Sequence, residues 1–192
     1  MKKIALLFML LYPTLIWGQK EDLIKFLDAH KTLEFEESKE VIAEHSLDLG
    51  SLYDIMNYEE PTGIIFDADT LGIKGYKAII NCKIKNKAEQ YIDKKMIAVM
   101  YLNKQKNIWC VGMFREAIDP KKEYNTAKSD VDAGKFYTKK QYVYRNLTYW
   151  SIYAGKLNEA IKWIKIAEEE ANKANDAKFN IESHKKILNK IL

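Results

Sequence analysis

The stretch YKAIINCKIKNK, residues 76–87, decides the fold class because apolar and polar side chains alternate along it. A period of two is typical of a strand that buries one face and exposes the other. Ile79 is the one apolar residue that breaks the alternation. The stretch therefore predicts a half-buried β-strand whose inward positions are Ala78, Ile80, Cys82 and Ile84.

Two further strand-like stretches follow on the C-terminal side. KMIAVMYL, residues 95–102, and NIWCVGMF, residues 107–114, flank NKQKN, a polar turn of hairpin length. The segment from Met96 to Leu102 is apolar on both faces, which is expected of a central strand covered on both sides. Together the three stretches predict a small antiparallel sheet within residues 63–116.

Helical patterns lie on both sides of this sheet. EDLIKFLDAH, residues 21–30, has apolar side chains at helical spacing. A second pattern runs from Glu37 to Tyr58, with Gly50 weakening its middle; its apolar face holds Ile42, His45, Leu49, Leu52 and Met56. From Asp119 to the end the pattern is helical again. We expect an α+β protein with an α+β region over residues 19–118 and a helical lobe over 119–192, joined without a linker-like segment.

The first residues resemble a targeting segment. Lys2 and Lys3 precede an apolar run from Ile4 to Trp17, and Gly18 offers a small residue before a cleavage point. This arrangement predicts a secretory signal peptide over residues 1–18 and a mature chain from Gln19, in the periplasm or outside the cell. The run is too short for a comfortable bilayer span, so no stable membrane span is expected.

The charge balance and the two cysteines limit which partners and cross-links are expected. Without the signal peptide, 29 basic residues (31 minus 2) face 27 acidic ones, which does not favour a nucleic-acid partner. If the chain is exported, Cys82 and Cys110 are in a compartment where disulfides can form. A bridge between them and two buried free thiols are both open alternatives.

GIIFDADTLGI, residues 63–73, is the stretch that most resembles a catalytic motif. It is similar to the start of haloacid-dehalogenase phosphatases, but Thr70 follows Asp69 without the residue that the family places between them. A calcium loop is the second interpretation, although Leu71 and Ala78 stand where further ligands are needed. The remaining interpretation, a strand that runs into a polar turn, requires no chemistry and is the one we favour.

The C-terminal part contains two similar turns, Ala133–Phe136 and Ala154–Leu157. Each contains a glycine where one helix would end in a left-handed residue and the next begin, which predicts helices over about 137–153 and 158–175. The pair resembles a single tetratricopeptide repeat over residues 141–174. The resemblance rests on Tyr144, Leu147, Thr148, Gly155, Leu157, Ala160, Ile164 and Ala167.

The resemblance implies a groove-facing surface on the first helix, made of Tyr142, Arg145, Tyr149, Ile152 and Tyr153. Tyr and Arg carry many binding hot spots, whereas the alternative is that this aromatic face packs inside the molecule. Three separated histidines and the lack of nucleophile or phosphate motifs predict no catalytic, metal or cofactor site. We therefore expect a non-enzymatic module that binds a protein or peptide of the cell envelope or beyond.

Two other functions remain open. In the first, a secreted α+β protein binds a small ligand or hydrolyses it in a pocket on the sheet, with Tyr101, Trp109 and Met113 around the cavity. In the second, a structural subunit covers its exposed aromatic side chains by self-association.

Overall fold

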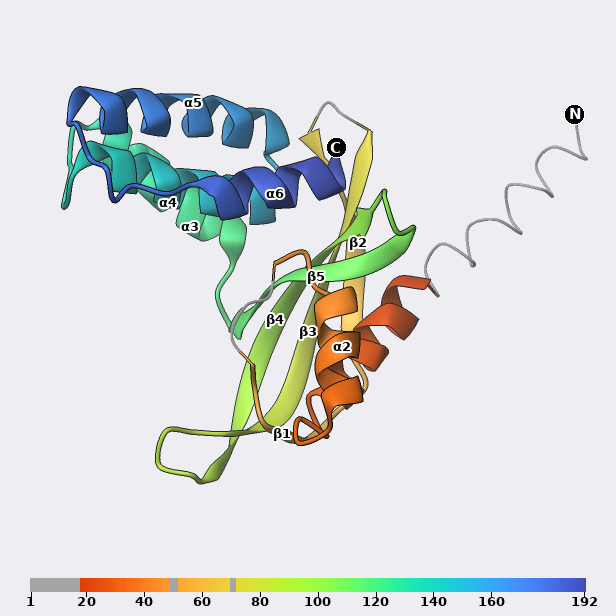
Figure 1. Ribbon diagram of the computed structural model, residues 1–192. Coiled ribbons are helices and arrows are strands. Elements are labelled where there is room, and N and C mark those ends of the chain that lie inside the picture. Colours follow the sequence, from red (N-terminus) through yellow and green to blue (C-terminus); the bar gives the residue numbers. More distant parts are fainter. Residues whose placement is uncertain (1–17, 49–51, 70–71) are drawn as a thin grey trace, which may run out of the picture. The chain divides into compact units, whose positions relative to one another are not determined.

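A computed structural model describes residues 18–48, 52–69 and 72–192 (Figure 1). The described chain combines helices with a five-stranded sheet in which β1 pairs antiparallel with β3 and β4 with β5, so the predicted α+β class is confirmed. Residues 18–29 are helical and α2 spans Glu36–Glu44. The strands are β1 (Ile55–Tyr58), β2 (Thr62–Ala68), β3 (Ile73–Lys85), β4 (Tyr91–Asn103) and β5 (Ile108–Glu116). Four helices follow: α3 (Pro120–Asp132), α4 (Lys140–Tyr153), α5 (Leu157–Lys173) and α6 (Glu182–Ile191).

The chain divides into two compact units. The first holds the described residues up to Ile65 together with Tyr76–Ala117, and the second holds Phe66–Gly75 together with Ile118–Leu192. The tip of the β2–β3 hairpin is thus grouped with the C-terminal helices and not with the rest of the sheet. The sequence pattern alone places this tip in the α+β region.

The sheet of the first unit has the strand order β1-β3-β4-β5, and β2 also pairs with β3. The β4–β5 hairpin closes at Asn103 and Ile108, as the polar turn predicts. Its register changes between Val99 and Met100, where Gly112 is the extra residue of a bulge. The strands expected within residues 63–116 are therefore present.

One sheet face packs against helix 18–29 and α2, which Figure 1 shows in front of the strands. All four inward positions predicted for residues 76–87 belong to this core, whereas Ile79 is 38% exposed. From β4 the core takes Met96, Ala98 and Met100, while Val99 on the opposite face is also fully buried. Burial on both faces explains why this part of β4 is apolar throughout.

The helix predicted over residues 37–58 is wrong in its second half. The helix ends at Glu44, and residues 45–47 instead join the sheet: the His45 carbonyl accepts the Val111 N–H at 2.7 Å. Residues 55–58 form β1, in which Ile55 is buried and Met56 is half exposed. The other predicted helical positions, Leu49 and Gly50, lie outside the described residues. Pairing with β5 and β3 outweighs the helical spacing here.

The helices of the second unit are joined by the two predicted glycine turns. Gly134 ends α3 with φ 69° and Gly155 ends α4 with φ 77°, both in the left-handed region. The Lys156 N–H bonds to the Ser151 carbonyl at 2.8 Å, which closes the C-terminal turn of α4. The helices predicted over 137–153 and 158–175 correspond to α4 and α5.

The tip of the β2–β3 hairpin is fastened to the α4–α5 turn within the second unit. The Asp69 N–H donates to the Gly155 carbonyl at 2.8 Å, and the Asp69 carboxylate accepts the Asn158 N–H at 2.8 Å. Lys156, the N-cap residue of α5, makes no side-chain cap hydrogen bond. The Asp69 carboxylate, from the β2–β3 hairpin, therefore acts as the hydrogen-bond acceptor that the N-terminus of α5 lacks in its own N-cap residue.

No helix in the described part of the chain is long and apolar enough to cross a membrane. The predicted signal peptide covers residues 1–18, of which 1–17 lie outside the described residues, so it stays a prediction.

Candidate functional site

The five α4 residues expected to face a groove do not share one environment. Ile152 and Tyr153 are 0% and 3% exposed and belong to the core of the second unit. Tyr142, Arg145 and Tyr149 are partly exposed. The predicted surface is therefore reduced to these three residues, because the C-terminal part of α4 is buried on this side as well.

Tyr142 and Arg145 form a stacked cluster with Phe179, which lies in the segment between α5 and α6. The Tyr142 and Phe179 rings meet edge to face at 5.6 Å between centroids. The Arg145 guanidinium carbon lies 4.9 Å from the Tyr142 ring centre and 6.0 Å from that of Phe179. Arg145 Nη1 also donates to the Asn180 carbonyl at 3.3 Å. We call Tyr142, Arg145 and Phe179 the aromatic–arginine cluster.

Tyr149 extends this surface along α4 towards α6. Its ring contacts that of Tyr153 at 4.8 Å and that of His184 at 6.1 Å. His184 is itself partly exposed and lies in the first turn of α6. Aromatic and histidine rings from two helices therefore meet at one partly solvated surface.

Asp176 fixes the segment that carries Phe179. Gln141 Nε2 donates to its carboxylate at 2.9 Å, the Lys178 N–H at 3.1 Å, and Lys139 Nζ lies 3.5 Å away. These donors, the Gln141 amide foremost, hold the pKa of Asp176 below its ordinary value. The carboxylate thus ties the start of α4 to the loop after α5.

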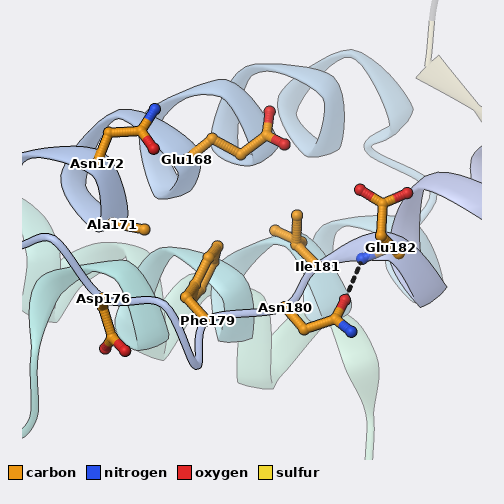
Figure 2. A pocket seen from close by; sticks show the side chains of 8 residues that line it. All are labelled: Glu168, Ala171, Asn172, Asp176, Phe179, Asn180, Ile181 and Glu182. Carbon is orange, nitrogen blue, oxygen red and sulfur yellow. Dashed lines mark hydrogen bonds between the residues drawn. The ribbon is translucent and has the colours of Figure 1, made fainter.

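A pocket of about 560 Å³ lies beside the cluster, between the end of α5 and the segment that leads into α6 (Figure 2). Its apolar lining comes from Ala171, Phe179 and Ile181, and Figure 2 shows Phe179 and Ile181 extending towards α5. Carboxylate and amide side chains complete the lining: Glu168, Asn172, Asp176, Asn180 and Glu182. Lys185 pairs with both Glu168 and Glu182, so part of the acidic charge is neutralised. The lining is therefore mainly polar, with a smaller apolar part made by Ala171, Phe179 and Ile181.

The first unit contains a buried carboxylate–histidine pair, Asp22 and His45. Asp22 accepts the Trp109 N–H at 2.9 Å, and its other oxygen lies 3.6 Å from His45 Nε2. His45 Nδ1 is 3.0 Å from the Val41 carbonyl. Both imidazole nitrogens face structural partners, which leaves no nitrogen to activate a nucleophile. The pair joins helix 18–29 to α2 and β5.

Asp67 and Asp69 also have structural partners. Asp67 forms an ion pair with Lys74 across the hairpin, and Asp69 caps α5. Among the described residues, no three His, Cys, Asp or Glu side chains are grouped as metal ligands would be. Thr70 and Leu71 lie outside the described residues. The strand expected from residues 63–73 is β2, and Asp69 follows it directly.

Cys82 and Cys110 are both free and buried. They lie on β3 and β5, which β4 separates in the sheet. Two strand spacings amount to roughly 9–10 Å, beyond the Cα separation that a disulfide bridges. Burial raises the pKa of the Cys82 thiol to about 11. The bridge that the sequence left open is therefore absent, and the free-thiol alternative holds.

The residues expected around a sheet pocket pack on different faces. Trp109 belongs to the core beneath the N-terminal helices, whereas Tyr101 and Met113 are buried outside that cluster. A second hollow of about 480 Å³ is lined by other residues, from β1, β3 and β4 and the segments beside them. The described structure therefore does not gather Tyr101, Trp109 and Met113 around one cavity.

Sequence reasoning missed Phe179, Asn180 and His184, which complete the surface of α4. Their only local signal is an aromatic residue followed by asparagine between two helical patterns. Comparison with known proteins adds no assignment: no family model, curated protein or solved structure matches this chain.

Proposed function

We propose that this is an exported, non-enzymatic protein that binds a protein or peptide partner through its helical unit. The observation that carries the proposal is the aromatic–arginine cluster of Tyr142, Arg145 and Phe179. These side chains are partly exposed yet held by mutual stacking. Aromatic and arginine side chains fixed in this way lose little conformational entropy when a partner covers them, as at interface hot spots.

The adjacent pocket supports a partner that inserts a side chain or a short extended segment. Phe179 belongs to both features, so a bound chain could cover the cluster and enter the pocket without interruption. The Asn172 amide offers a donor and an acceptor to a peptide backbone, whereas Asn180 offers its NH2 group, because its Oδ1 already accepts the Glu182 N–H at 2.8 Å. The resemblance to a tetratricopeptide hairpin points to the same helical unit as a binding module.

Affinity capture with matched variants tests the proposal. The bait is the chain from Gln19, exposed to the envelope fraction of its native host, beside Tyr142→Ala/Arg145→Ala and the control Tyr137→Ala. Tyr137 is 80% exposed in the same unit, so its substitution removes an aromatic surface residue outside the cluster. Thermal unfolding of all three proteins checks that the baits are folded.

We expect a partner that wild type and Tyr137→Ala retain and the double variant loses. Calorimetric titration with that purified partner then measures the loss, which we expect to exceed about tenfold for two hot-spot residues. Equal capture by all three baits would show that the cluster is not the binding surface. Export is tested separately, by whether the intact mass of the protein from the envelope or medium corresponds to a chain that begins at Gln19.

A further inference from the structure

The residue at which the mature chain is predicted to begin is a buried glutamine. Gln19 is 0% exposed and lies in the first turn of helix 18–29. Neither Nε2 nor Oε1 of its amide has a hydrogen-bond partner among the described residues. A buried polar group without a partner destabilises a folded protein, so this amide calls for an explanation.

The position of Gln19 on the helix accounts for its burial. Leu23 and Phe26, four and seven residues further on, lie on the same side of the helix and belong to the core of the first unit. Gln19 therefore begins the row of side chains with which helix 18–29 packs against the sheet. In a chain that starts at Gln19, the α-amine lies at the N-terminal end of this packed row.

A protonated α-amine is unfavourable at this position. The N-terminal end of a helix is the positive end of the helix dipole, so a cation there is destabilised. Asp22, one turn further on, is the carboxylate that would offset the charge, but it already has other partners. Its Oδ2 accepts the Trp109 N–H at 2.9 Å, and its Oδ1 lies 3.2 Å from Lys25 Nζ and 3.6 Å from His45 Nε2. An open N-terminus thus combines a charged amine and an unpartnered amide in one residue.

We propose that Gln19 is the first residue of the mature chain and is cyclised to pyroglutamate. The α-amine nitrogen attacks the side-chain carbonyl carbon Cδ and forms a C–N bond, while the bond between Cδ and Nε2 breaks. Nε2 takes up one amine proton and leaves as ammonia, so the step requires no oxidant, reductant or other reactant. The product is a five-membered lactam.

The lactam removes both unfavourable features of the open residue. Its nitrogen is an amide nitrogen that does not become protonated, so the end of the helix carries no cation. The side-chain NH2 group is lost, so one unpartnered buried group is removed. This inference rests on the export in the proposed function, because the α-amine of Gln19 exists only after the preceding residues have been removed.

Mass spectrometry of the protein isolated from its native envelope or medium tests the modification. Free amines are labelled first, so that cyclisation during handling is excluded, and a protease that cuts after aromatic residues then releases the peptide 19–26. We expect this peptide to lack a label on its α-amine and to be lighter than the encoded peptide by one ammonia molecule. A labelled α-amine on Gln19 would overturn the cyclisation and leave export intact. A different first residue would overturn both the cleavage prediction and the cyclisation.

A comparison in vitro tests the structural reason. The chain from Gln19 is prepared with an open and with a cyclised N-terminus, beside the control Gln19→Glu, which has the same chain length but no amide. We expect the cyclised form to unfold at a higher urea concentration than the open form, and Gln19→Glu to keep its free α-amine under the conditions of cyclisation. Equal urea midpoints of the open and cyclised forms would overturn the argument from burial. The partner-capture experiment uses α4 residues, so binding and modification can fail independently.

Discussion

The two glycines that end α3 and α4 allow the contact with the hairpin tip to be measured. Gly134 and Gly155 have nearly equal φ values, 69° and 77°, so an alanine at either position has similar backbone strain. The left-handed conformation costs a residue with a Cβ atom about 1–2 kcal/mol. Gly134→Ala meets nothing within 4 Å, so we expect it to lower the free energy of unfolding by about this amount.

Gly155→Ala adds a steric term. Its Cβ would lie 2.8 Å from Phe66 Cε2 and 3.5 Å from Ala68 Cα, both in the hairpin tip. Phe66 has little room to move, because its ring is also packed against Gly75, where an added Cβ would lie 2.2 Å from Phe66 Cζ. Overpacking of this kind costs roughly 1–3 kcal/mol. We expect Gly155→Ala to be more destabilising than Gly134→Ala by about that difference.

Urea unfolding followed by far-ultraviolet circular dichroism measures both variants against wild type. A second pair in the Phe66→Ala background completes a double-mutant cycle, in which the excess cost of Gly155→Ala should disappear. If the two alanine variants lose the same free energy, or the excess survives without the Phe66 ring, the proposed contact between the hairpin tip and the α4–α5 turn is refuted.

Three further perturbations have defined outcomes. Asp69→Ala should lower the free energy of unfolding by about 1 kcal/mol, because the start of α5 loses its only described side-chain cap, and Asp69→Asn should recover part of this in the same urea titration. Burial lowers the pKa of His30, so the unfolded chain binds a proton at this residue at a higher pH than the folded chain does. The free energy of unfolding should therefore fall as the pH decreases below about 6.5. In urea titrations from pH 7.5 to 5, His30→Asn should reduce this pH dependence, whereas the control His184→Asn, at a partly exposed site, should not. Cys82 and Cys110 should react with a maleimide only after denaturation, as mass spectrometry would show; rapid labelling of the folded protein would contradict their burial.

Local patterns were sufficient to predict β3, β4, β5 and the ends of α3 and α4, but not β1 or the end of α2. The inward positions on β3, such as Ile80, follow from alternation alone, and alternation is a property of neighbouring residues. The left-handed glycines Gly134 and Gly155 were equally predictable, since few other residues adopt that conformation without strain. These features depend on a few adjacent residues and not on distant partners.

The segment after α2 shows where local periodicity fails. Leu52 and Met56 continue the helical spacing of Ile42, yet both are about half exposed. What the chain gains there instead is pairing with β5 and β3, whose paired residues are at least 24 positions away in the sequence. Spacing along a helix cannot reveal such partners, so tertiary pairing overrides it.

The candidate site was predicted only in part, because local spacing does not reveal which distant segments pack against a helix. Helical geometry correctly groups Tyr142, Arg145 and Tyr149 on one side of α4, because residues three and four apart are neighbours. It does not reveal which neighbouring element covers each turn, so the burial of Tyr153 and the arrival of Phe179 could not be derived. Those facts depend on how the segment after α5 returns along the helix.

The interleaved composition of the two units limits how the gene can be divided. Each unit takes residues from two separate stretches, so no single cut yields two self-sufficient fragments. A fragment that starts at Ile118 keeps α5 but loses Asp69, which caps it. A fragment that ends at Ala117 keeps the tip of the β2–β3 hairpin but lacks the α4–α5 turn that the tip contacts. Recombination or truncation at the apparent sheet–helix border should therefore be poorly tolerated. Co-expressed halves would have to reassociate through residues 66–75 before either recovered its full stability.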